Sequence, residues 1–180
     1  MSDIAIVSVS WNAKVYLLKC LLSIRTSPAG ADAEVVVVDN DSDDGSPDAV
    51  ETAFPDVKVI RTGQNLGFAA ANNIGIQQAG GDCVFLINSD VELKDDCLGK
   101  LRQFMNVHPD VGMTGPHVLN GDGSPQPSCR TLPSISNSLL RMFALDTFLD
   151  KFSASDADAA ESADVDVLSG CFWCVRRSAL

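Results

Sequence analysis

The sequence predicts an α/β fold in which helices cover both faces of a mainly parallel sheet, with a Rossmann-like first half. Two observations support this prediction. Apolar runs of strand length alternate four times with segments of helical period. The runs are also continuously apolar, most clearly in the four valines at 35–38, which is typical of strands covered on both faces.

Each predicted element has a local signal. Helices are expected after each strand, with Asn12, Ser46 and Asp95 as the caps of the first, second and fourth. The third helix is expected over 68–78, because glycines at both of its ends favour turns there. The runs that predict the four strands are apolar and mostly β-branched, at 4–10, 34–38, 57–61 and 83–87.

The strand–helix rhythm changes beyond Pro109. Pro133 introduces a stretch of helical period, and an apolar run near the end of the sequence predicts a last strand. Two further strands are expected to be joined by the Asn-Gly-Asp-Gly turn at 120–123. The three strands predicted in this part of the chain are 111–119, 124–130 and 165–175.

Composition and charge exclude several classes of protein. The 180 residues carry a net charge of −11, which argues against a nucleic-acid-binding surface because phosphate contacts need clustered Lys and Arg. No apolar run approaches the roughly 20 residues that span a bilayer, and the first residues lack the basic flank of a secretory signal. We therefore expect a soluble, cytoplasmic protein, with a mobile acidic loop at 150–164.

The six cysteines show no paired spacing. Cys171 and Cys174 form a C-x-x-C, but they lie in a predicted buried strand, and a tetrahedral zinc site would need two more ligands. We expect buried, reduced thiols that pack as small apolar side chains.

Polar residues follow each of the first four predicted strands. They occupy 10–12, 39–46, 65–73 and 88–92, where the sequence is rich in Asn, Asp and Ser. Because ligands of parallel sheets bind at the carboxyl ends of the strands, these segments predict one binding cleft.

The acidic residues at these strand ends indicate the kind of ligand. The phosphate-binding glycine motifs are absent, and Asp39 and Asp90 would repel a pyrophosphate by about 4 kcal/mol per close pair at intermediate dielectric. A divalent cation, Mg²⁺ or Mn²⁺, between the carboxylates and the phosphates would offset this repulsion. Asp90 is the best metal-ligand candidate. In an extended segment Asn88, Asp90 and Glu92 would point the same way.

The acidic residues at these strand ends could also have structural roles instead of binding a ligand. Asp39 can accept the ring N–H of a uracil or thymine base, and the alternative is an Asx-turn or a helix cap. Asp90 could likewise be a cap or turn carboxylate. Asp41, Asp43 and Asp44 are expected to form the turn and to carry solvated charge.

Five segments together resemble the nucleotide-sugar domain of the family 2 glycosyltransferases, which have the GT-A fold. The third of them, rich in asparagine, is similar to the rhamnosyltransferase-type members that use dTDP-rhamnose or a similar donor. The segments occur in the family's order, at 7–12, 38–46, 65–75, 86–90 and 169–177.

The resemblance implies roles for individual residues. Ser10 and Asn12 would flank the nucleotide, and Asp39 would take the base. Asn88-Ser89-Asp90 stands where the family has its Asp-x-Asp metal motif, which leaves Asp90 as the metal carboxylate. The further nucleotide-sugar-binding residues implied are Asn40, Asn65, Gly67, Asn73 and Asn88.

The resemblance also implies an organisation and a reaction. Residues 1–180 would form one glycosyltransferase domain, with a nucleotide-binding half at 1–107 and an incomplete acceptor-side half at 108–180. The general base for inverting transfer is expected beyond Leu180, so no catalytic residue is assigned, and we expect the 180-residue chain to transfer sugar poorly. The acceptor would be a lipid-linked saccharide, a polysaccharide or a protein, and the full-length enzyme could associate peripherally with a membrane.

Three other functions make different demands on the sequence. A sugar-nucleotide pyrophosphorylase would need an early glycine-rich loop, and 8–14 contains no glycine. A phospho-receiver domain would need an acid pair after the first strand and a lysine on a late strand, and 10–12 and 111–119 lack them. A non-catalytic nucleotide-sugar-binding module remains open.

Overall fold

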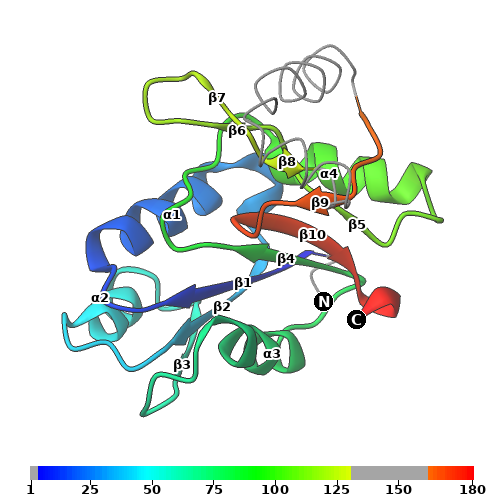
Figure 1. The fold of residues 1–180 in the computed structure, drawn as a ribbon. Helices are drawn as coiled ribbons and strands as arrows, with labels where there is room; N and C mark the ends of the chain where they lie inside the picture. Colours follow the sequence, from blue (N-terminus) through cyan, green and yellow to red (C-terminus); the bar gives the residue numbers. More distant parts are fainter. Residues whose placement is uncertain (1–3, 131–161) are drawn as a thin grey trace, which may run out of the picture. The chain divides into compact units, whose positions relative to one another are not determined.

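The computed structural model describes residues 4–130 and 162–180 (Figure 1). The chain divides into two compact units, one formed by 1–116 with 170–180 and the other by 117–169. The helical stretch expected after Pro133, and the acidic loop except for its last three residues, lie outside the described residues.

The first unit is built on a six-stranded sheet that confirms the predicted α/β class. The four strands predicted from apolar runs are mutually parallel, and β10 is antiparallel to both of its neighbours. In sheet order the strands are β3 (Lys58–Arg61), β2 (Glu34–Asp39), β1 (Ile4–Ser10), β4 (Cys83–Ile87), β10 (Phe172–Arg176) and β5 (Met113–Thr114).

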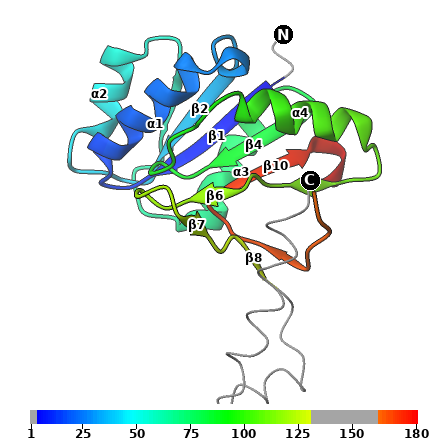
Figure 2. The same ribbon diagram turned by 90° about the horizontal axis from the view of Figure 1, so that it is seen from above.

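Helices cover both faces of this sheet (Figure 2). Helices α1 (Lys14–Thr26), α2 (Ser46–Ala53) and α4 (Cys97–Val107) pack on one face, and α3 (Phe68–Gln78) packs on the other. The short 3₁₀ turns η1 (Pro28–Gly30) and η2 (Arg177–Ala179) follow α1 and β10.

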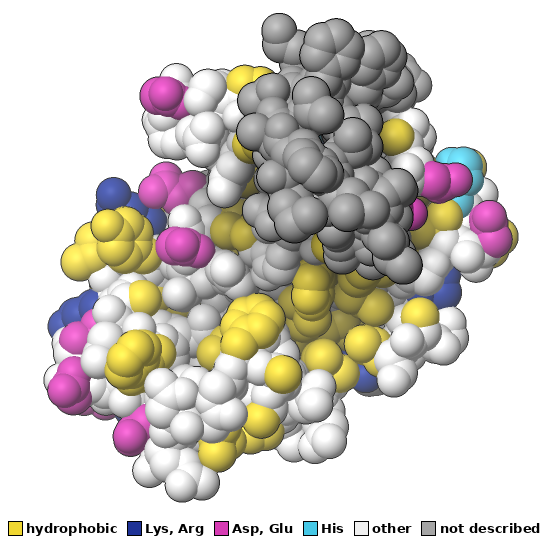
Figure 3. Space-filling view, in the orientation of Figure 1, with side chains coloured by type: hydrophobic (Ala, Val, Ile, Leu, Met, Phe, Trp, Pro, Cys, Tyr) yellow, Lys and Arg dark blue, Asp and Glu magenta, His cyan; other side chains and the backbone are white. Residues whose placement is uncertain are grey.

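The two cores follow the alternation of side chains along the strands. In β1, Ile4 and Ile6 face α1 and α4, whereas Ala5 and Val7 face α3. Helix α3 approaches β1 closely because Gly75 has no side chain; a Cβ there would lie 2.2 Å from Val7 Cγ1. Figure 3 shows apolar side chains gathered near the middle of this face of the molecule.

The helix caps differ by one residue from the predictions. The cap of α1 is Ala13 rather than Asn12, and the cap of α4 is Asp96 rather than Asp95, with the Asp96 carboxylate accepting from Gly99 N. Asn12 and Asp95 instead have φ of 50° and 52°, so each belongs to the left-handed turn that precedes the cap. Gly45, with φ 73°, caps α2 in place of Ser46.

All three late strands are interrupted where a continuous strand was expected. Pro127-Ser128 separates the two pieces of the strand expected at 124–130. Gly115-Pro116 ends β5 before β6 (Val118–Leu119), because proline has no N–H for a ladder. Ser169-Gly170 likewise separates β9 (Val167–Leu168) from β10.

The second unit contains two short antiparallel pairs. Strand β6 pairs with β7 (Pro125–Gln126) across the predicted turn, where Asn120 N donates to Ser124 O. Strand β8 (Cys129–Arg130) pairs with β9. The hairpin prediction is therefore confirmed, although its strands are shorter than the sequence suggested.

All six cysteines are free. Cys174 is buried and Cys171 is half-buried, so the C-x-x-C contributes to the packing of β10 and its neighbours. Burial, reinforced by Cys83 beside it, raises the pKa of the Cys174 thiol, which keeps it protonated at neutral pH.

Candidate functional site

A cleft of about 810 Å³ opens at the carboxyl ends of β1, β2 and β4. It lies within the first unit, where the loops after these strands meet the first turns of α1 and α3. Its lining contains six residues predicted from the sequence and six that were not. They are Val9, Trp11, Asn12, Ala13, Tyr16, Asn40, Asn65, Gly67, Phe68, Asn88, Ser89 and Asp90.

Three predicted site residues do not line this cleft. Ser10 and Asp39 are buried beside each other as the paired last residues of β1 and β2. Asn73 is exposed on α3, so its role stays a prediction. Its neighbour Asn72 is buried, and the side-chain amide of Asn72 donates to Phe68 O at 2.9 Å.

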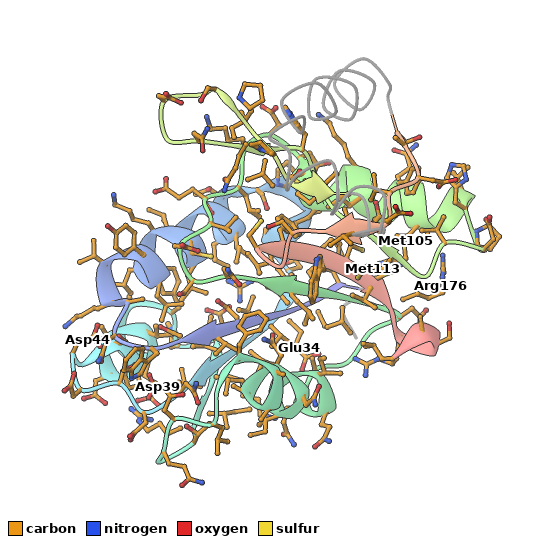
Figure 4. All side chains as sticks on the ribbon, in the orientation of Figure 1. Glu34, Asp39, Asp44, Met105, Met113 and Arg176 are labelled. Atoms are coloured by element: carbon orange, nitrogen blue, oxygen red, sulfur yellow. The ribbon has the colours of Figure 1, made fainter. Side chains whose placement is uncertain are left out.

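Asp39 has one carboxylate oxygen engaged and one without a partner. Its side chain is at the carboxyl end of β2 (Figure 4), and the residue is 3% exposed. Oδ2 accepts from Ser42 N at 3.2 Å, as an Asx-type turn requires. Oδ1 is buried and has no hydrogen-bond partner among the described residues. Because a buried, unpaired carboxylate oxygen is costly, Oδ1 is ready to accept a donor from a ligand.

Two asparagines build the adjoining wall of the cleft. Asn40 Nδ2 donates to Asn65 Oδ1 at 3.0 Å, and Asn40 Oδ1 accepts from Leu66 N at 2.9 Å. Asn65 Oδ1 also accepts from Gly67 N, and Gly67 has a φ of 77°, which favours glycine. These bonds hold the loop before α3 against the end of β2.

The acidic segment after β4 turns rather than continuing as an extended chain. Val91 N donates to Asn88 O at 3.2 Å, so the expected alternation of Asn88, Asp90 and Glu92 is wrong. Asp90 is exposed and lines the cleft, whereas Glu92 is exposed but does not line it. The turn therefore presents one carboxylate to the cleft where the extended segment would have presented two.

Asp90 has carboxylate oxygens, which are the ligand atoms that a hard divalent cation prefers. Among the described residues no group of three or more His, Cys, Asp or Glu could hold a metal by itself. Mg²⁺ commonly takes one or two carboxylates and completes its shell with substrate phosphates and water, which fits a lone exposed Asp90. Burial, and then the charges of Asp90 and Glu92, raise the pKa of the Cys20 thiol to about 12.

Three aromatic side chains at the cleft were not predicted as site residues. Trp11, Tyr16 and Phe68 are 58%, 60% and 47% exposed, although aromatic side chains of this size usually bury most of their surface. A signal was present for Tyr16, because it lies off the apolar stripe that α1 buries. For Trp11 and Phe68 the only signal was their position next to polar strand ends.

The structure is an α/β fold with a cleft at the carboxyl edge of a mostly parallel sheet. The model of the family "Glycosyl transferase family 2" matches residues 5–180. The chain therefore belongs to glycosyl transferase family 2, and its fold is the GT-A fold of its structural neighbours. This membership decides against the phospho-receiver and pyrophosphorylase alternatives.

Curated relatives include a rhamnosyltransferase. The N-acetylglucosaminyl-diphospho-decaprenol L-rhamnosyltransferase of Mycobacterium tuberculosis is 31% identical over 147 residues, which cover 75% of this chain and 48% of the relative. A dolichol-phosphate mannosyltransferase of Pyrococcus furiosus is 25% identical over 150 residues, covering 82% and 42%. The chain thus spans about half the length of the curated relatives it matches.

Solved structures agree on the fold. A mannosyltransferase from Pyrobaculum calidifontis in complex with GDP-Man and Mn²⁺ has a TM-score of 0.67 at 20% identity, covering 98% of this chain and 45% of that one. S. aureus TarS 1–349 in complex with UDP-GlcNAc has a TM-score of 0.56 at 25% identity, covering 71% and 38%. No helix among the described residues is long and apolar enough to cross a membrane.

Proposed function

We propose that this chain binds a nucleotide-diphospho-sugar donor, with uracil or thymine as the base, for inverting transfer to an acceptor hydroxyl. The observation that supports the proposal best is the buried, unpartnered Oδ1 of Asp39 beside the cleft. Uracil and thymine carry one ring N–H between two carbonyls, and that N–H is the donor that Oδ1 lacks. The similarity to a rhamnosyltransferase makes dTDP-rhamnose the first donor to test.

The rest of the cleft suits the diphosphate and its counter-ion. The first turn of α3, which begins at the cleft residue Phe68, has backbone N–H groups without intrahelical partners, and the amino terminus of a helix favours negative charge. Asp90 would hold Mg²⁺ or Mn²⁺, which would supply positive charge to the two phosphates and to the leaving nucleoside diphosphate. A Mn²⁺-bound structural neighbour supports this choice of ion.

In the proposed reaction the acceptor oxygen bonds to the anomeric carbon while the bond from that carbon to the phosphate oxygen breaks. The nucleoside diphosphate leaves, and the acceptor proton passes to a base that the proposal assigns to none of the described residues. The described residues have two tasks in this scheme. They orient the base through Asp39, and they hold the diphosphate next to Asp90.

The relatives support a choice of acceptor class. Two of them have names that specify a decaprenol diphosphate and a dolichol phosphate, so we propose a lipid-linked saccharide or lipid phosphate as acceptor. An acceptor of this kind lies at a membrane surface, and the whole enzyme would then work there.

The donor proposal is tested by calorimetric titration of UDP, dTDP and GDP, each with and without MnCl₂. We expect UDP or dTDP to bind and GDP to bind far more weakly. Asp39→Asn should weaken binding about 30-fold, because its single amide oxygen can serve Ser42 N or the base N–H but not both. Asp110→Asn, an exposed carboxylate outside the cleft, is the matched control.

Unchanged affinity in Asp39→Asn would contradict the assignment of the base site. Sugar transfer from the donor that binds, measured with a synthetic polyprenyl-diphosphate saccharide, then separates a transferase from a non-catalytic binding module.

A further inference from the structure

Two loops at the edge of the cleft are joined to each other across 30 residues of sequence. The first loop, residues 11–13, links β1 to α1, and the second loop, residues 40–45, links β2 to α2. Asn12 N donates to Ser42 Oγ at 2.9 Å, and Asp43 N donates back to Asn12 Oδ1 at 2.9 Å. Asn12 therefore bonds to the second loop with both its backbone and its side chain.

Asp44 makes the third connection. Its Oδ2 accepts from Lys14 N at 2.8 Å. Lys14 is the first residue of α1, so its N–H is one of the first four in the helix that have no intrahelical partner, and the cap residue Ala13 has no polar side chain that could accept from any of them. Asp44 thus does for α1 what a local capping residue ordinarily does.

The same carboxylate is also bound to the start of α2. Asp44 Oδ1 accepts from Ser46 N at 2.9 Å and from Ser46 Oγ. One side chain therefore receives donors from the first residues of two helices, whose amino termini both favour negative charge. Burial alone would raise the pKa of Asp44, but these hydrogen bonds and the charge of Lys14 hold it below its usual value, so the carboxylate is ionised at neutral pH.

Both loops hold backbone conformations that a free chain rarely adopts. Asn12 has φ 50° and Asp41 has φ 72°, in the left-handed region that is unfavourable for residues other than glycine. Such conformations persist when surrounding bonds over-determine them. The three inter-loop hydrogen bonds supply that constraint.

From this geometry we infer that Asp44 and Asn12 are positioning residues that lock the two loops together and so preorganise the donor site. The inference rests on the proposed function. Trp11 and Ala13 line the cleft from the first loop, and Asp39 immediately precedes the second, so the lock sets the spacing between the two sides of the base site. The Asn12 amide oxygen is already engaged by the second loop, which makes Asn12 a part of the lock rather than a nucleotide acceptor.

The test compares two isosteric substitutions in the same loop. Asp44→Asn has one acceptor oxygen in place of two, so it cannot satisfy both Lys14 N and Ser46 N. Asp41→Asn removes the same charge, tolerates the same left-handed φ, and changes an exposed side chain that no described residue bonds. Both are made in a Trp173→Phe background, so that Trp11 is the remaining tryptophan.

Two readouts are needed. Acrylamide quenching of Trp11 without any nucleotide reports the freedom of the first loop, and titration of dTDP and UDP reports affinity. We expect Asp44→Asn to raise the quenching constant and to weaken nucleotide binding about tenfold, as it would if the locked arrangement were populated about a tenth of the time. Asp41→Asn should change neither readout.

A folded Asp44→Asn protein with unchanged quenching and affinity overturns the inference. If Asp44→Asn does not fold, Ser42→Ala replaces it, because this substitution removes the hydrogen bond from Asn12 N. Ser42→Ala should raise the quenching constant and weaken nucleotide binding about threefold. If neither quantity changes in Ser42→Ala, the inference is overturned. If the wild-type protein binds neither nucleotide, the proposed function fails, and the quenching comparison alone then decides about the lock.

Discussion

Buried polar atoms differ in their hydrogen bonding between the two ends of the parallel strands, which Asp39 and Arg176 mark in Figure 4. At the carboxyl end, Ser10 Oγ and Asp39 Oδ1 are buried without a hydrogen-bond partner among the described residues. At the amino end of β4, the guanidinium groups of Arg176 and Arg177 donate to seven backbone carbonyls in total. The comparison separates polar atoms whose hydrogen bonds stabilise the fold from buried polar atoms that the fold leaves without a partner.

The amino end of β4, which we call the arginine end, receives these hydrogen bonds because β10 runs antiparallel to β4. This strand ends where β4 begins, so its last residue and the one after it reach the carboxyl termini of two helices. Arg176 donates to Met105 O, His108 O and Val111 O at the end of α4. Arg177 does the same at the end of α3, donating to Ile76 O, Ala79 O, Gly80 O and Gly81 O. Unpaired carbonyls and the negative end of the helix dipole make a helix terminus a favourable site for such cations.

The largest effect should come from the arginine end. Arg177→Ala removes the donors of four carbonyls, and we expect the free energy of unfolding to fall by about 3 kcal/mol in urea titrations. Nucleotide affinity of the folded protein should not change, because Arg177 is far along the sheet from the cleft. Arg61→Ala, which breaks exposed ion pairs with Asp48 and Glu51, is the control and should cost about 0.5 kcal/mol. Equal losses in the two variants would refute the structural role of Arg177.

A smaller effect is expected at the ligand end. Asp90→Asn should abolish the gain in nucleotide affinity that MnCl₂ provides, a loss of about tenfold or about 1.4 kcal/mol. Metal-free affinity should not fall, because the substitution removes a charge that repels the diphosphate, and thermal stability should not change. Glu92→Gln removes a charge from the same segment but from outside the cleft, so it should keep the Mn²⁺ dependence. If both variants keep that dependence, Asp90 is not the metal ligand.

The smallest effect concerns pH. The pKa of Asp44 is lowered in the folded state, so its contribution to stability is complete above the unfolded value of about 3.9 and is lost as the pH falls through the lower folded value. The difference in unfolding free energy between wild type and Asp44→Asn should be about 1 kcal/mol from pH 7 to 5 and should shrink below pH 4. A difference that grows with acidification would mean that Asp44 is not bound in its ionised form.

Several features of the site could be predicted because they depend on local pattern and a general rule of topology. Asp39 and Asp90 were predicted by combining the ends of apolar runs with the rule that parallel sheets bind ligands there, and in the structure Asp90 lines the cleft while Asp39 is buried beside it. The residues that hold the loops around them in place were not predicted. The sequence predicted Asp44 to be a solvated turn residue. In the structure α1 has no capping side chain of its own, and Asp44 accepts from Lys14 N in its place. The alternation predicted for 88–92 failed because a hydrogen bond from Val91 to Asn88 turns the chain.

By itself the sequence determined the four parallel strands of the first unit and the helices that follow them, because side-chain periodicity and continuous apolar runs are local properties. The tertiary structure alone decided which distant groups meet: Lys14 with Asp44, and the arginine pair with two helix ends. The physical reason is that a hydrogen bond depends on atoms a few ångströms apart. Neither composition nor spacing along the chain says which of the many donors and acceptors folding will bring to that distance.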